Sequence, residues 1–243
     1  MINDLNEDKR QINSNLKSIR NQIVNAAKKS GRLLQDISII GVTKTIDVDR
    51  MEMLYDEGII SFGENKVQEL MDKYDRFQNR IKWHLIGHLQ TNKVKYIVGK
   101  VELIHSVDSI DVLGEIDKRA KKLGIIQNVL IQVNVSGEET KYGFSPDEVA
   151  HVVEVAKDYK SIKVKGLMTM APNYENVENT RPVFRCLKDL FDHISKENHE
   201  NVKMEVLSMG MTHDYEVAIE EGSNMIRLGT AIFTLSCKMK CPS

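Results

Sequence analysis

The chain has few cysteines, few prolines and almost no excess charge. Its three cysteines, Cys186, Cys237 and Cys241, are too few and too unevenly spaced for a disulfide framework, so we expect a reducing, cytoplasmic compartment. The 34 Lys and Arg residues balance 35 Asp and Glu, and a net charge of -1 provides no field to gather nucleic acid or an anionic membrane. Four prolines and no Ser/Gly-rich stretch leave no linker. We therefore predict one domain over residues 1–243.

Long hydrophobic runs and a targeting segment are also missing. No apolar run approaches the roughly 18 residues that a membrane-spanning helix needs, and the first thirty residues are polar, which argues against a signal or transit peptide. What the chain does have is 41% hydrophobic and 28% charged residues, the composition of an ordinary globular protein. A length of 243 residues is typical of a single (β/α)8 barrel.

The first segment has the pattern of an amphipathic helix. Apolar residues recur at helical spacing between residues 5 and 27, and Gly31 provides a stop signal. We predict an extra N-terminal helix within residues 1–31, ahead of the barrel.

Short apolar or β-branched runs then alternate with segments that carry helix start and stop signals. The runs cover residues 37–42, 59–62, 81–85, 103–105, 129–135, 164–167, 204–207 and 225–228. Eight such alternations favour a closed (β/α)8 barrel over an open doubly wound sheet, which normally has five or six strands.

The loops after the last two predicted strands have the composition of a phosphate site. In (β/α)8 barrels the functional residues lie at the carboxyl ends of the strands, and the loops after strands seven and eight often bind phosphate through hydroxyls and backbone N–H groups. Ser208 directly follows the seventh predicted strand, and Gly229 and Thr230 follow the eighth. We predict that these three residues hold the phosphate of a small ligand.

A lysine, Lys44, follows the first predicted strand. An amine held among apolar residues and near another cation loses proton affinity and becomes nucleophilic towards a carbonyl, and Arg227 at the end of strand eight could be that cation. A phosphorylated aldehyde would satisfy both features, with its carbonyl bound to Lys44 as a Schiff base. Pyridoxal phosphate (PLP) is the commonest cofactor of this kind.

Less specific interpretations stay open at this point. A lone lysine is usually a solvated surface charge, and Arg227 could instead pair with an acid near a strand end. A Schiff-base aldolase acting on sugar phosphates would need the same lysine and phosphate site, without a partner for a pyridine ring. His84 and His88 are four residues apart but fall on a strand end and its loop, so we expect no metal site.

The motifs at the strand ends resemble those of the PLP homeostasis proteins, which are related to the N-terminal barrel of alanine racemase. The resemblance extends from about residue 39 to residue 233. Its segments are Val42-Thr43-Lys44, Phe62-Gly63-Glu64-Asn65, Gln68-Glu69, Trp83-His84-Leu85-Ile86-Gly87, Leu89-Gln90, Asn92-Lys93, Gly166-Leu167-Met168, Ser208-Met209-Gly210-Met211 and Arg227-Leu228-Gly229-Thr230-Ala231-Ile232-Phe233.

The resemblance implies a set of cofactor contacts. Lys44 would hold PLP as a Schiff base, Arg227 would face the pyridine nitrogen, and Asn65 would lie beside the cofactor. The phosphate would lie at the three residues already assigned to it. Because an arginine stays protonated, the pyridine nitrogen opposite it tends to remain unprotonated, which makes the ring a weaker electron sink.

The resemblance also implies a function. Members of the family act in intracellular PLP (vitamin B6) homeostasis as carriers without strong catalysis, with PLP-dependent apo-enzymes as potential acceptors, and we expect a monomer. The alternative is a small PLP-dependent amino-acid racemase or decarboxylase. Alanine racemase needs a second, β-rich domain and a catalytic tyrosine, and the ten residues after Phe233 leave no room for that domain.

Two features depart from the family pattern. Thr212 stands where serine is common, which keeps a hydroxyl. The segment 234–243, with Cys237 and Cys241, does not look like the usual ending, and we expect a flexible tail without an assigned role.

Overall fold

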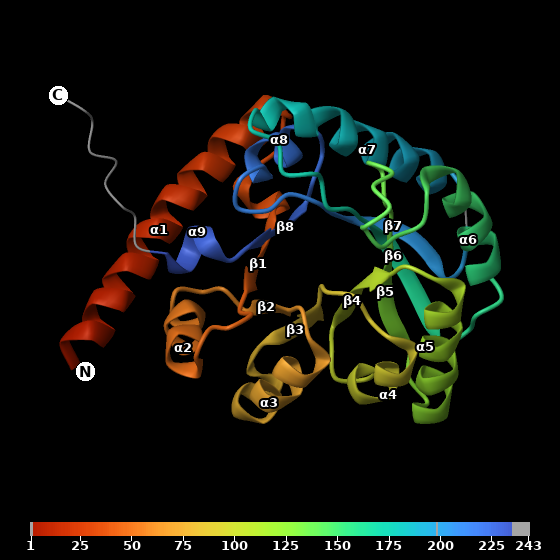
Figure 1. Cartoon of the computed structure of the whole chain (residues 1–243), viewed down its shortest axis with the longest axis horizontal. Helices are drawn as coiled ribbons and strands as arrows, with labels where there is room; N and C mark the ends of the chain where they lie inside the picture. The colour runs from red at the N-terminus through yellow and green to blue at the C-terminus, as the bar shows by residue number, and fades with distance from the viewer. Residues whose placement is uncertain (1, 198, 235–243) are drawn as a thin grey trace.

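The computed structural model describes residues 2–197 and 199–234 and shows a closed barrel of parallel strands (Figure 1). The strands follow one another around the barrel in chain order, and β1 closes it by pairing with β8. Each predicted run overlaps one strand, so the predicted (β/α)8 barrel is confirmed. The strands are β1 (Ser38–Val42), β2 (Ser61–Glu64), β3 (Lys82–Leu85), β4 (Leu103–Val107), β5 (Gln127–Gln132), β6 (Ile162–Met168), β7 (Val202–Ser208) and β8 (Met225–Leu228).

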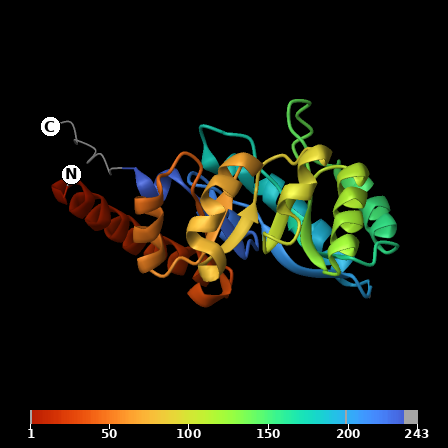
Figure 2. The same cartoon turned by 90° about the horizontal axis from the view of Figure 1, so that it is seen from below.

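Helices connect the strands and cover the outside of the barrel (Figure 1). The α-helices are α1 (Ile2–Lys29), α2 (Val48–Asp56), α3 (Val67–Phe77), α4 (Val94–Ile97), α5 (Ile110–Leu123), α6 (Val149–Ala156), α7 (Arg181–Ser195), α8 (Tyr215–Glu220) and α9 (Thr230–Phe233). Short 3-10 helices are η1 (Leu34–Asp36), η2 (Gln78–Arg80), η3 (Thr91–Lys93), η4 (Pro146–Glu148) and η5 (Val177–Thr180). In Figure 2 the segments that follow β5 and β6 rise on the same side of the barrel.

The predicted N-terminal helix is confirmed as α1, which runs along α8 and α9 (Figure 1). Four of its apolar residues recur every three or four positions and are at most 3% exposed, as an amphipathic helix requires. They are Ile12, Leu16, Ile19 and Ile23. On the same face Asn15 donates to the carbonyls of Ile232 (2.9 Å) and Thr234 (3.0 Å). In this way α1 fixes α9 beside the end of β8.

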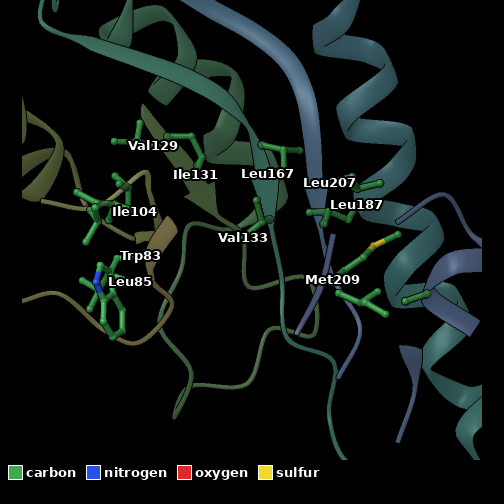
Figure 3. Packing of buried hydrophobic residues seen from close by; sticks show 14 of the residues in the cluster. Trp83, Leu85, Ile104, Val129, Ile131, Val133, Leu167, Leu187, Leu207 and Met209 are labelled. Atoms are coloured by element: carbon green, nitrogen blue, oxygen red, sulfur yellow. The ribbon is translucent and has the colours of Figure 1, made fainter. Parts of the chain in front are cut away.

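Outward-facing strand residues form the main core against the helices, as Figure 3 shows for Trp83, Leu207 and their neighbours. Trp83 packs edge-to-face against Phe62 of β2 and Phe77 of α3, with ring centroids 6.3 and 6.2 Å apart. Successive strand residues point to opposite faces. The neighbour of Trp83, His84, therefore points into the barrel.

The inside of the barrel combines a small apolar cluster with a column of polar groups. Leu103, Leu130 and Met168 form the apolar cluster. The polar column consists of four buried side chains from four strands: His84, His105, Ser208 and Arg227. This column links the interior of the barrel to the end at which the functional residues were predicted.

Two of the expectations concern membranes and the tail. None of the helices in the described part of the chain combines the length and apolar character that a membrane span needs. The predicted tail, with Cys237 and Cys241, lies outside the described residues except for Thr234.

Candidate functional site

Lys44 lies two residues beyond β1, at the rim formed by the carboxyl ends of the strands, and is exposed. The expected apolar surroundings are therefore not what the structure shows. The next residue, Thr45, has a φ of 61° and is the one non-glycine residue with positive φ within the described ranges. Such a backbone conformation is costly for a β-branched residue and is concentrated at functional sites. The turn that presents Lys44 is thus held in place by its surroundings.

A buried ion pair supports this turn. Glu64, at the end of β2, is fully buried and accepts from the Thr43 hydroxyl and from Lys73 Nζ, both at 2.7 Å. Lys73 Nζ also donates to the backbone carbonyl of Thr43 (2.7 Å), directly before Lys44. The sequence alone assigns no role to Glu64 or Lys73. An acid at the end of a strand inside a resemblance motif was the signal that could have found the pair.

Arg227 lies beneath the rim and is 3% exposed. Its Nη1 donates to Ser208 Oγ (2.7 Å) and its Nη2 donates to the carbonyl of Thr169 (2.9 Å). Burial lowers the pKa of Arg227 to about 10, and the nearby Asp214 carboxylate opposes this change. The guanidinium therefore stays charged at neutral pH, and Nε has no hydrogen-bond partner among the residues that the structure describes.

Two histidines continue the polar column below Arg227. His105 Nδ1 lies 3.0 Å from Ser208 Oγ, and His105 Nε2 lies 3.0 Å from His84 Nδ1. Burial lowers the pKa of His84 to about 3 and that of His105 well below its usual value, so both rings are neutral at pH 7. From the sequence, His105 was not singled out, and His84 appeared only within a resemblance motif and as an improbable metal ligand. The sequence signal that could have identified both histidines is a polar residue at an inward-facing position of an otherwise apolar strand.

The predicted phosphate residues occupy two levels of the barrel. Gly229 and Thr230 lie at the rim, where α9 begins, and Thr212 Oγ1 accepts from the backbone N–H of Ala231 there (3.2 Å). Ser208 is fully buried, and its hydroxyl already contacts Arg227 and His105. Besides Thr230 itself, Thr212 therefore places a hydroxyl at the first turn of α9.

The order of the strands brings the rim residues together. β1 pairs with β8 on one side and with β2 on the other, so Lys44 lies between Gly229 and Asn65. A Cβ added to Gly229 would lie 3.3 Å from the carbonyl oxygen of Val42, which shows how closely β8 approaches the end of β1. A Cβ on Gly87 would lie 2.2 Å from the carbonyl oxygen of Asn65, so only glycine allows this contact between the two loops.

A cavity of about 540 Å³ extends from Asn65 over the loops that follow β2 and β3. Its lining residues are Asn65, Lys66, Val67, Gln68, Met71, His88, Gln90, Lys93 and Tyr96. His88 Nδ1 is 2.6 Å from Asp108 Oδ2, and its ring stacks on Tyr142. The described residues contain no group of three or more His, Cys, Asp or Glu side chains that could hold a metal ion.

Comparison with known proteins places this arrangement in a family. The family model for the alanine racemase N-terminal domain matches residues 10–237. A PLP homeostasis protein of Aquifex aeolicus is 45% identical over 219 residues, which are 90% of this chain and 95% of that protein. The PLP homeostasis protein of Schizosaccharomyces pombe is 35% identical and covers 91% of this chain and 92% of its own length.

Solved structures agree with the sequence comparison. The PipY protein of Synechococcus elongatus, solved with PLP bound, is 28% identical with a TM-score of 0.79, and the match covers 92% of this chain and all of PipY. An alanine racemase of Clostridium difficile is 20% identical with a TM-score of 0.72, which shows a shared fold; the match covers 93% of this chain and 59% of the racemase. The chain therefore belongs to the pyridoxal phosphate homeostasis proteins, within the alanine racemase N-terminal domain family.

Proposed function

We propose that this chain binds PLP at the rim of the barrel, holds it covalently on Lys44, and acts in PLP homeostasis without strong catalysis. The observation that carries the proposal is the buried Arg227, whose charged guanidinium retains a free Nε next to the rim where Lys44 lies. The family membership and the PLP bound to PipY support the same assignment.

The residues at the rim fit the parts of PLP. PLP, when bound, would supply an aldehyde, and Lys44 would supply the amine for condensation with release of water. We assign the phosphate to the hydroxyls and backbone N–H groups of Gly229, Thr230 and Thr212, which lie together where α9 begins. Asn65 borders the same rim. We assign Ser208 to holding Arg227, because its hydroxyl is buried and already engaged on both sides.

Arg227 disfavours strong catalysis. Its guanidinium is fixed by two hydrogen bonds and is protonated at neutral pH, so Nε could only donate a hydrogen bond to the pyridine nitrogen of bound PLP. Arg227 would thereby keep that nitrogen unprotonated, and the ring would withdraw electrons less strongly from a bound amino acid. Racemisation and decarboxylation both depend on that withdrawal.

The exposed position of Lys44 suits a carrier. Water and incoming amines can reach its Nζ from the rim, so the cofactor can be released or passed on without opening the barrel. We infer that PLP-dependent apo-enzymes receive it, and that the protein works as a cytoplasmic monomer. The exposed free thiol of Cys186 is consistent with a reducing compartment.

Borohydride trapping tests the proposal. The full chain is incubated with PLP, reduced with borohydride and digested, and mass analysis is expected to find the pyridoxyl group on Lys44. Lys44→Ala should abolish the visible absorption band of the complex, whereas Lys66→Ala, which changes an exposed lysine on the same rim, should retain it. Labelling of another lysine, or no labelling at all, would overturn the assignment.

The same preparation addresses the two alternatives. Proton exchange at the α-carbon of a panel of amino acids is expected to be no faster than with free PLP, and a clearly faster rate would establish a racemase or decarboxylase. Borohydride reduction in the presence of sugar phosphates should leave no sugar skeleton on Lys44. Such an adduct would establish an aldolase.

A further inference from the structure

A second cavity opens at the opposite end of the barrel, where the strands begin. It has a volume of about 160 Å³, and all eight strands contribute to its lining. We call it the floor cavity, and its lining residues are Ser38, Ser61, Lys82, His84, Glu102, Leu103, Asn128, Lys165, Val206 and Met225. This volume limits a ligand to a few non-hydrogen atoms.

The innermost polar group of the floor cavity is the ring of His84. The side chain is 3% exposed, and its Nδ1 is occupied by His105. Its Nε2, on the other side of the ring, is buried and has no hydrogen-bond partner among the described residues. A buried polar atom without a partner is costly, so Nε2 indicates a group that is still to be bound.

The polar column determines whether His84 Nε2 donates or accepts. A guanidinium can only donate, so Ser208 Oγ accepts from Arg227. Within the described residues the Ser208 hydroxyl hydrogen has one acceptor, His105 Nδ1. Because Nδ1 accepts, it is unprotonated, and a neutral His105 then carries its proton on Nε2. His105 Nε2 donates to His84 Nδ1, which leaves the His84 proton on Nε2. The column therefore ends in an N–H donor on His84, which lines the floor cavity.

The charges around the floor cavity favour an anion. Lys82 and Lys165 line it, against one acid, Glu102. Lys165 is paired with Glu205, a carboxylate that also lies within the electrostatic influence of Lys163 and Lys203. Four lysines thus stand against two acids among these residues, and the hydroxyls of Ser38 and Ser61 also line the cavity.

We propose that the floor cavity is a second binding site, which takes a small carboxylate or another small oxyanion on the Nε2–H of His84, with Lys82 at its entrance. This site is distinct from the rim and requires no PLP, so its test does not depend on the proposed function.

Histidine NMR on the full chain tests the proposal without any substitution. In protein with ¹⁵N-labelled histidine, His84 and His105 are both expected as neutral rings protonated on Nε2. Titration with sodium formate should shift the His84 Nε2–H signal saturably, and sodium acetate and inorganic phosphate, tested separately, distinguish a carboxylate from an inorganic oxyanion. Sodium chloride at equal ionic strength should leave the signal unchanged.

Matched variants locate the site. Lys82→Gln, an exposed position, should weaken the affinity for formate about threefold, as expected for one partly screened charge. Lys122→Gln, on the exposed surface of α5, should not change it. The proposal is overturned if His84 is protonated on Nδ1, if none of the three oxyanions shifts its signal, if chloride produces the same shift, or if Lys82→Gln binds formate as the parent does.

Discussion

Replacing Ser208 by alanine tests whether this hydroxyl positions Arg227. The substitution removes one hydrogen bond to a buried guanidinium (2.7 Å) and one to a neutral histidine (3.0 Å). A bond to a charged group is worth about 1.5–3 kcal/mol and a neutral one about 1 kcal/mol, so we expect the free energy of unfolding to fall by about 3 kcal/mol. Urea denaturation at pH 7 measures this loss, and at a slope of about 3 kcal/mol/M the midpoint should fall by about 1 M.

Ser106→Ala provides the matched control. Ser106 is as deeply buried as Ser208, but its hydroxyl donates only to the neutral carbonyl of Gly87 (2.6 Å). Its loss should cost about 1 kcal/mol. If Ser208→Ala destabilises the protein no more than Ser106→Ala does, then the Ser208 hydroxyl does not hold a buried charge, and its assignment as the positioning residue for Arg227 is refuted.

Two further predictions concern other buried groups. Burial lowers the pKa of His84 from 6.5 to about 3, so between these pH values the unfolded chain binds more protons than the folded chain, and the free energy of unfolding falls as the pH falls below 6.5. His84 alone should lower the free energy of unfolding by about 2 kcal/mol at pH 5. His84→Phe should therefore show a shallower pH dependence of stability in urea denaturation. An unchanged slope would contradict a neutral, buried His84. Lys73→Met leaves the buried Glu64 carboxylate without its cation and should cost about 3 kcal/mol or more in urea denaturation, whereas Lys66→Met, at an exposed lysine, should cost less than about 1 kcal/mol. Because the loss comes from the unpaired carboxylate, Glu64→Gln should restore stability to the Lys73→Met protein, and a failure to do so would contradict this cause.

The barrel could be predicted from the sequence because its signals are local and repeated. Eight apolar runs, each followed by a helical segment, determine the strand count, and the strand ends then give the level of Lys44, Gly229 and Thr230 on the rim. The amphipathic pattern of α1 is equally local. These features depend on the spacing of residues along the chain rather than on tertiary contacts between side chains.

The features of the site that the sequence could not predict depend on contacts across the closed barrel. The roles of Ser208 and His105 follow from their meeting Arg227 and His84 in the interior, and four different strands supply these residues. The exposure of Lys44 depends on the turn at Thr45, and the Glu64–Lys73 pair stabilises this turn through Thr43. Composition and periodicity carry no information about contacts between residues that are far apart in the chain, so only the structure shows these contacts.

The pairing of β1 with β8 has a consequence for protein synthesis. Lys44 leaves the ribosome early, whereas Arg227 and the first turn of α9 emerge only after nearly the whole barrel has been made. A nascent chain therefore displays the amine long before it has the arginine or the phosphate residues that would retain PLP. If PLP binds as proposed, its full set of contacts is complete only when β8 pairs with β1 and closes the ring of strands.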